Sequence, residues 1–84
     1  MSYQLYILSR AQKSLEKLPV GIYEQVRDEI RSLSIEPRPF GCKKLVGRDG
    51  WRIRIRKYRA VYSIDDEKQT LTVLDIDHRK DIYR

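Results

Sequence analysis

The sequence predicts an α+β fold in which an N-terminal strand is followed by a two-helix hairpin packed on an antiparallel β-sheet. Apolar residues recur at helical spacing between residues 9 and 33, whereas from residue 43 onward they alternate with polar residues, as in strands. Two prolines within residues 36–39 separate the two regions, because proline interrupts a helix. The chain has 84 residues, the length of one small domain, and we expect residues 1–84 to form a single unit.

The first expected elements are a strand over residues 3–8 and a helix that follows it directly. The strand segment, YQLYIL, is short, apolar and rich in aromatic and β-branched side chains. Ser9 and Gln12 have the spacing of a capping box, so we expect Ser9 to cap the helix and Pro19 to end it. The apolar face of this helix has residues at i, i+4 and i+7, namely Ala11, Leu15 and Leu18.

A second helix and four strands complete the predicted fold. The apolar positions of the helix are Tyr23, Val26, Ile30 and Leu33. The segments with strand alternation are residues 43–47, 51–55, 58–65 and 70–78. The turn between the second and third of these strands is Arg56 and Lys57, which is unusual because a two-residue hairpin turn favours Gly, Asn or Asp with positive φ.

The basic residues are concentrated in one segment. Residues 42–59 contain eight Lys or Arg residues against one acidic residue, Asp49, and so carry +7, whereas the whole chain carries +6. The eight are Lys43, Lys44, Arg48, Arg52, Arg54, Arg56, Lys57 and Arg59. Clustered cations displace counterions from a phosphate backbone, so this segment indicates a polyanionic partner.

The predicted hairpin of residues 51–62 places three of these cations on one face. With a two-residue turn at its tip, Arg54 lies opposite Arg59, and strand alternation puts Arg52 on the same face. The other face is suited to packing on the helices and consists of Trp51, Ile53, Ile55, Tyr58, Ala60 and Tyr62. Two facing arginines repel each other by up to about 1 kcal/mol, which a bound anion removes. No acidic residue is expected on the arginine face, which favours anion binding over a merely solvated surface.

The C-terminal segment, residues 77–84, carries side chains suited to RNA cleavage. His78, the only histidine, is expected at the tip of the last strand, with Arg79, Lys80 and Tyr83 after it. Beside the strand arginines they supply an imidazole for proton transfer, guanidinium groups for phosphate and a phenol that stacks on a base. These are the parts of a metal-free ribonuclease, in which the RNA 2′-hydroxyl attacks the adjacent phosphorus. The alternative is an ordinary polar strand end with Tyr83 as an apolar anchor. The other tyrosines are expected in the core or at its edge.

Several other function classes find no support in the sequence. Cys42 is the only cysteine, so neither an internal disulfide nor a Cys/His zinc site is expected, and a reducing cytoplasm fits best. No segment approaches the roughly 18 apolar residues of a membrane span, and the first ten residues do not resemble a signal peptide. We find no Gly-rich phosphate loop, Ser/His/Asp arrangement or metal-ligand spacing, and we expect no metal or cofactor.

The order of the elements and two motifs resemble the RelE/ParE superfamily of toxins from prokaryotic type II toxin–antitoxin systems, and within it the RelE-type mRNA interferases. The motifs are YRAVY at residues 58–62 and HRKDIY at residues 78–83, and the resemblance covers essentially the entire chain. It implies the RelE-like microbial RNase fold and a metal-independent, ribosome-dependent endoribonuclease. Such a toxin cleaves mRNA in the decoding A site, leaves a 2′,3′-cyclic phosphate and a 5′-hydroxyl, and thereby inhibits translation.

The resemblance also implies partners. They are a cognate antitoxin, mRNA and the 70S ribosome with its 16S rRNA. The toxin–antitoxin complex is expected to be hetero-oligomeric and to bind operator DNA through the antitoxin. The residues expected to contact RNA or the ribosome are Lys43, Lys44, Arg48, Arg56, Lys57 and Lys80.

Carried over residue by residue, the family's catalytic positions fall on Arg52, Arg54, Arg59, Arg79 and Tyr83. Members with lysine at the two strand positions can use one as a proton acceptor, but arginine stays protonated. His78 is therefore the expected general base, the strand arginines are expected to clamp the phosphate, and Asp77 is expected to influence how His78 is aimed or charged.

Two alternatives remain open. A ParE-like inhibitor of DNA gyrase has the same fold without nuclease activity, although that branch generally lacks the His and Tyr end together with clustered strand cations. A non-catalytic RNA-binding module would use the arginines and Tyr83 for binding alone. Mutation of His78 separates a catalyst from such a module.

Overall fold

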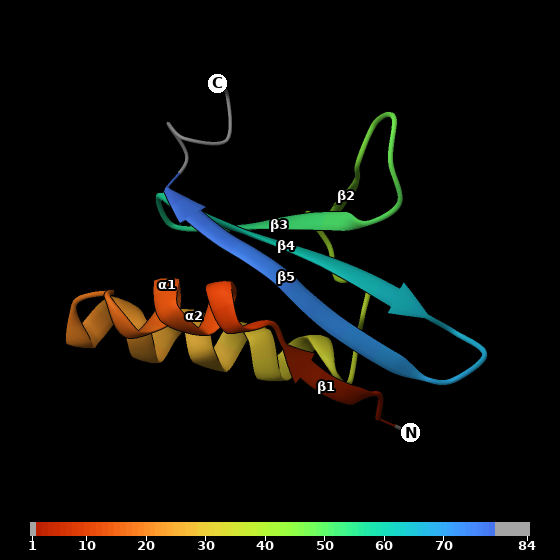
Figure 1. Ribbon diagram of the computed structural model, residues 1–84, viewed down its shortest axis with the longest axis horizontal. Coiled ribbons are helices and arrows are strands. Elements are labelled where there is room, and N and C mark those ends of the chain that lie inside the picture. Colours follow the sequence, from red (N-terminus) through yellow and green to blue (C-terminus); the bar gives the residue numbers. More distant parts are fainter. Residues whose placement is uncertain (1, 79–84) are drawn as a thin grey trace.

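The computed structural model describes residues 2–78 and has the predicted α+β architecture, with two helices on one side of a five-stranded sheet (Figure 1). In chain order the elements are β1 (Gln4–Ile7), α1 (Ser9–Glu16), α2 (Val20–Leu33), β2 (Lys43–Lys44), β3 (Trp51–Ile55), β4 (Tyr58–Asp65) and β5 (Thr70–His78). Within this part of the chain, no helix is long and apolar enough to cross a membrane.

The sheet has the strand order β1-β5-β4-β3-β2. Strands β2 to β5 form the predicted antiparallel meander, while β1 lies parallel to β5, a pairing that the sequence alone did not indicate. The chain then passes from β1 into α1 through Leu8, whose amide donates to the Val73 carbonyl at 3.0 Å. This pairing joins the N-terminal strand and the helices to the long hairpin of β4 and β5.

The core lies between the helices and one face of the sheet. The predicted apolar residues of both helices supply one side, with Ala11, Leu15, Val26, Ile30 and Leu33 at most 3% exposed. The sheet supplies Ile53, Ile55, Ala60, Tyr62, Leu71, Val73 and Ile76. Among the described residues, helices cover only this face, and the other face of the sheet carries no helix.

Two local predictions were wrong at the ends of elements. Ser9 is the first helical residue, and Leu8 holds the N-cap position without a side-chain hydrogen bond. The Gln12 side chain donates to Glu16 at 3.0 Å and does not reach back to the cap. The N-cap residue Leu8 has no side chain that can accept a hydrogen bond from the helix, and its backbone amide is bonded to β5 instead.

The predicted strand over residues 43–47 is also shorter, since β2 ends at Lys44. The chain turns away through Gly47 and Gly50, which have φ values of 80° and 130° that favour glycine. The expectation for the tyrosines holds for Tyr62, which is fully buried, but Tyr6 is 52% exposed on the edge strand β1.

A β-bulge interrupts the pairing of β4 with β5. Val61 lies opposite Asp75 and Tyr62 opposite Val73, so Leu74 is the additional residue. An extra residue moves every later side chain of the strand to the other face of the sheet. The bulge therefore decides which residues at the end of β5 share a face with the strand arginines.

Candidate nucleic-acid interface

The hairpin of β3 and β4 has the register predicted from the sequence. Arg54 lies opposite Arg59, Ile53 opposite Ala60 and Ile55 opposite Tyr58. Since Ile53 and Ala60 are buried against the helices, alternation directs the arginines to the face that neither α1 nor α2 covers.

The turn of this hairpin is strained as the sequence suggested. Arg56 has a φ of 55°, the left-handed region that most residues avoid. Its guanidinium Nε donates to the Gln25 side chain on α2, and its carbonyl accepts a bond from Arg54 Nε at 3.4 Å. The tip of the hairpin is thus attached to the second helix.

A small hollow of about 140 Å³ lies among the cations on the helix-free face. It is lined by Gly41, Lys43, Arg52, Arg54 and Arg59, which we call the cationic hollow. Lys43 reaches it because β2 pairs Lys43 with Arg52. Lys43 and Arg54 are exposed, whereas Arg59 is only 7% exposed. Four cations from three strands around one hollow form a site suited to a phosphate group.

The prediction that the arginine face has no acidic residue was wrong. Asp77 is the register partner of Arg59, and Asp75 is the partner of Val61, which places both carboxylates on this face. The cause is the bulge at Leu74, which the sequence pattern of β5 does not predict. Arg59 and Asp77 are each engaged within the chain, so Arg52, Arg54 and Lys43 are the cations best placed to meet an anion.

His78 lies at the end of β5, as predicted, but on the opposite face from the arginines. Its register partner is Tyr58, and the two rings meet edge to face with centroids 5.4 Å apart. If β5 alternated regularly through Leu74 without a bulge, His78 would lie on the same face as Thr72 and the arginines. The structure thus brings Arg52, Arg54, Arg59 and Lys43 together and separates the His78 ring from them.

The other cations expected to bind RNA occupy varied positions. Lys44 and Arg38 approach the Trp51 ring, with charged groups 5.5 Å and 5.1 Å from its centroid. Arg48 is exposed in the loop between β2 and β3, and Lys57 is exposed in the hairpin turn. The remaining predicted residues lie outside the described part of the chain, namely Arg79, Lys80 and Tyr83.

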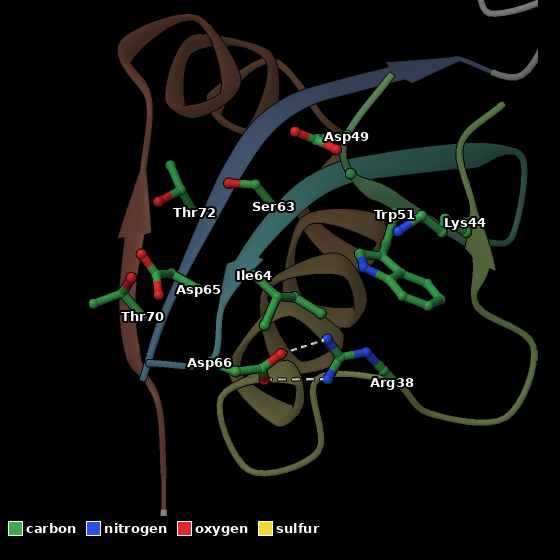
Figure 2. Close-up of a pocket in the computed structure, with 11 residues that line it drawn as sticks. Arg38, Lys44, Asp49, Trp51, Ser63, Ile64, Asp65, Asp66, Thr70 and Thr72 are labelled. Carbon is green, nitrogen blue, oxygen red and sulfur yellow. Dashed lines mark hydrogen bonds and ion pairs between the residues drawn. The ribbon is translucent and has the colours of Figure 1, made fainter. Parts of the chain in front are cut away.

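A polar cluster at the far end of the sheet was missed by the sequence analysis. Figure 2 shows Arg38 paired with Asp66 in a pocket of about 550 Å³, with Trp51 beside them. The two hydrogen bonds are 2.9 Å and 3.3 Å long, and the Tyr3 hydroxyl donates to the same carboxylate at 2.7 Å. Hydrogen bonds from Arg38 and then from Tyr3 lower the pKa of Asp66.

This cluster fixes the loop that borders the cationic hollow. The Tyr62 hydroxyl donates to the Pro37 carbonyl at 2.8 Å, and burial raises the pKa of that phenol. Arg38 follows Pro37 directly, so two successive residues of the loop are held against β4 and the turn after it. In the sequence this loop is marked only by its two prolines, which predict the end of a helix but not the ion pair of Arg38 with Asp66.

Comparison with known proteins defines the class to which this chain and its fold belong. Residues 5–83 match the family described as the ParE toxin of type II toxin–antitoxin systems, parDE. The chain therefore belongs to this toxin family, within the RelE/ParE superfamily, and is a toxin of a type II toxin–antitoxin system.

Individual relatives are RelE-type toxins. Toxin RelG of Mycobacterium tuberculosis is 38% identical over 88 aligned positions, which cover 100% of this chain and 99% of the relative. The toxin–antitoxin complex RelBE2 from the same organism matches with a TM-score of 0.83 and 33% identity, over 94% of this chain and 100% of that one. The isolated E. coli RelE toxin matches with a TM-score of 0.79 and 31% identity, over 98% and 92% of the two chains. These matches confirm the expected fold and superfamily.

Proposed function

We propose that this toxin is a ribosome-dependent endoribonuclease that cleaves mRNA in the ribosomal A site and so stops translation. The observation that carries the proposal is the cationic hollow, in which Lys43, Arg52, Arg54 and Arg59 surround a space suited to one phosphate group. The similarity to Toxin RelG and to the E. coli RelE toxin supports the same activity class.

In the proposed reaction a base removes the proton from the RNA 2′-hydroxyl, whose oxygen attacks the adjacent phosphorus. The bond from phosphorus to the 5′-oxygen breaks, and an acid protonates that oxygen. The products are a 2′,3′-cyclic phosphate and a 5′-hydroxyl. The arginines hold the scissile phosphate and stabilise the negative charge that develops on its oxygens, a form of catalysis that works best with donors already in place. All of these steps use protein side chains.

Proton transfer requires a group other than arginine, and His78 is the proposed acceptor. The neighbouring residue Asp77 lies opposite Arg59, so the backbone at the end of β5 borders the arginine face. The His78 ring itself contacts Tyr58 on the other face. The proposal therefore places phosphate binding on the face of β3 and β4 and proton transfer at the end of the sheet, with Arg79 and Tyr83 as further proposed members of the site.

We further propose that a cognate antitoxin binds this toxin and silences it. RelBE2 was solved as a toxin–antitoxin complex and covers nearly all of this chain. An acidic segment that covers the arginines would neutralise the helix-free face and exclude RNA from the cationic hollow.

The test is primer extension on a defined mRNA programmed into 70S ribosomes, with a control that lacks ribosomes. We expect new 5′ ends within the A-site codon that require the ribosome and fade in Arg52→Ala and Arg59→Ala. His78→Gln is expected to lose cleavage while ribosome binding is kept. Intact mRNA with well-folded wild-type protein would reject nuclease activity, and equal cleavage by His78→Gln would remove that residue from the chemistry.

Inhibition of DNA gyrase is the second candidate function, because the matching family model is the ParE toxin. A gyrase inhibitor would block supercoiling by purified gyrase in a plasmid assay and leave ribosome-bound mRNA intact. The two functions are thus separated by running both assays on one preparation.

A further inference from the structure

Phe40, the only phenylalanine of the chain, is the most exposed large apolar side chain among the described residues, at 105% of its reference area. Burying such a side chain stabilises a protein by about 1.5–3 kcal/mol, and this fold gains none of that free energy because Phe40 stays exposed. Tyr6 is 52% exposed on β1, at the opposite edge of the sheet from β2, and the other apolar side chains exposed by more than 70% are aliphatic, namely Val46, Val20 and Ile35. Phe40 differs from them both in being aromatic and in its position.

Phe40 stands at the corner of a tight turn beside the cationic hollow. The Cys42 amide donates to the Pro39 carbonyl at 3.1 Å, which closes a β-turn over Phe40 and Gly41. Gly41 has a φ of 97°, as this turn requires of its third residue. Gly41 also lines the hollow, so the Cα of Phe40 is about 3.8 Å from the Cα of a residue in its wall.

The turn is held in place by contacts on its N-terminal side. Pro37 accepts a hydrogen bond from the buried Tyr62, and Arg38 is paired with Asp66 and approaches the Trp51 ring. The space around Gly41 is open, since a Cβ built there would meet no atom within 4 Å. An exposed aromatic side chain is thus presented by an anchored turn next to an open anion site.

We propose that Phe40 is a stacking platform for a nucleobase of the RNA strand whose phosphate occupies the cationic hollow. Single-stranded RNA is bound by this combination, in which cations hold the backbone and an aromatic side chain stacks on an adjacent base. The inference rests on the RNA binding in the proposed function and adds a base contact that none of the arginines provides. A protein partner on Phe40 is the competing explanation, and the cations next to it favour RNA.

The test compares two probes of equal length and charge, a short 2′-O-methyl oligoribonucleotide and an abasic strand with the same backbone. The methyl groups block the 2′-oxygen, so binding is measured without cleavage. The wild type should bind the strand with bases more tightly. Phe40→Ala and Phe40→Leu should lose about 5- to 150-fold in affinity for that strand and little for the abasic one.

Phe40→Tyr keeps a stacking surface and should bind like the wild type, as should Val46→Ala, the matched change at another exposed apolar residue. Because both positions are exposed, circular dichroism should show every variant folded. Unchanged RNA binding by Phe40→Ala, or full binding by the non-aromatic Phe40→Leu, would overturn the proposal. So would a wild type that binds neither probe or shows no preference for bases.

The outcomes also separate this inference from the proposed function. A wild type that prefers the strand with bases through Phe40, yet leaves ribosome-bound mRNA intact, would keep the stacking contact and reject the nuclease. A Phe40→Ala variant that loses only antitoxin binding would instead assign Phe40 to a protein interface and overturn the stacking role.

Discussion

Replacement of Arg54 by glutamine should make the protein more stable and at the same time a weaker binder of polyanions. Arg54 lies directly opposite Arg59, and the side chains of such a cross-strand pair are close enough for like charges to repel. Arg59 is 7% exposed, so solvent screens this repulsion less than it would on an open surface. Glutamine keeps a long polar side chain and removes the charge, together with the long 3.4 Å hydrogen bond from Arg54 Nε to the Arg56 carbonyl.

The expected gain in the free energy of unfolding is a few tenths of a kcal/mol to about 1 kcal/mol, the range for cross-strand pairs. For a domain of this size, 1 kcal/mol corresponds to a rise in Tm of about 4–8 °C. Thermal unfolding followed by circular dichroism in low-salt buffer measures it. Lys68→Gln is the matched control, because Lys68 is an exposed cation in the turn between β4 and β5 and should leave Tm nearly unchanged.

Anion binding should change in the opposite direction. Inorganic phosphate at constant ionic strength should raise the Tm of the wild type by mass action and raise that of Arg54→Gln less. For a single-stranded oligoribonucleotide, loss of one phosphate contact should reduce the slope of log K against log salt by about 0.7. A destabilised Arg54→Gln variant would refute the like-charge argument. A variant that phosphate stabilises as much as it stabilises the wild type would refute the cationic hollow as an anion site.

Three further predictions concern stability. Tyr62→Phe should cost about 1 kcal/mol in urea unfolding, because it removes a buried hydroxyl that donates to a loop carbonyl; an unchanged midpoint would contradict this. Gln69→Gly should stabilise by up to about 1 kcal/mol, since Gln69 has a φ of 53° in an exposed turn, and a lower Tm would show that this backbone strain is negligible. Hydrogen bonds from Arg38 and Tyr3 lower the pKa of Asp66, so its contribution is complete above the unfolded-state pKa of about 4 and is lost as the pH falls through the lower folded-state value. Asp66→Asn should therefore reduce Tm at neutral pH and lose this effect in acid, whereas an equal loss at both pH values would exclude a role for ionisation.

The sequence alone determined the helices, the long strands and the register of the hairpin that carries the arginines. These features depend on residues that are close together in the sequence. Prolines mark the ends of the helices, and the alternation from Trp51 to Ile55, continued from Tyr58 across the Arg56–Lys57 turn, predicts the pairing that buries Ile53 and Ala60 together. The arginine face followed from that alternation, and so did the strain at Arg56.

The tertiary structure decided what stands beside the arginines. The extra residue at Leu74 moves Asp77 onto their face and His78 away from it, and a bulge depends on how two strands fit over the core rather than on one strand's pattern. Lys43 and Gly41 reach the cationic hollow only through the pairing of β2 and the anchored loop before it. Such contacts join residues that are far apart in the chain. Their energies therefore depend on how the elements pack together, which no single segment of the sequence determines.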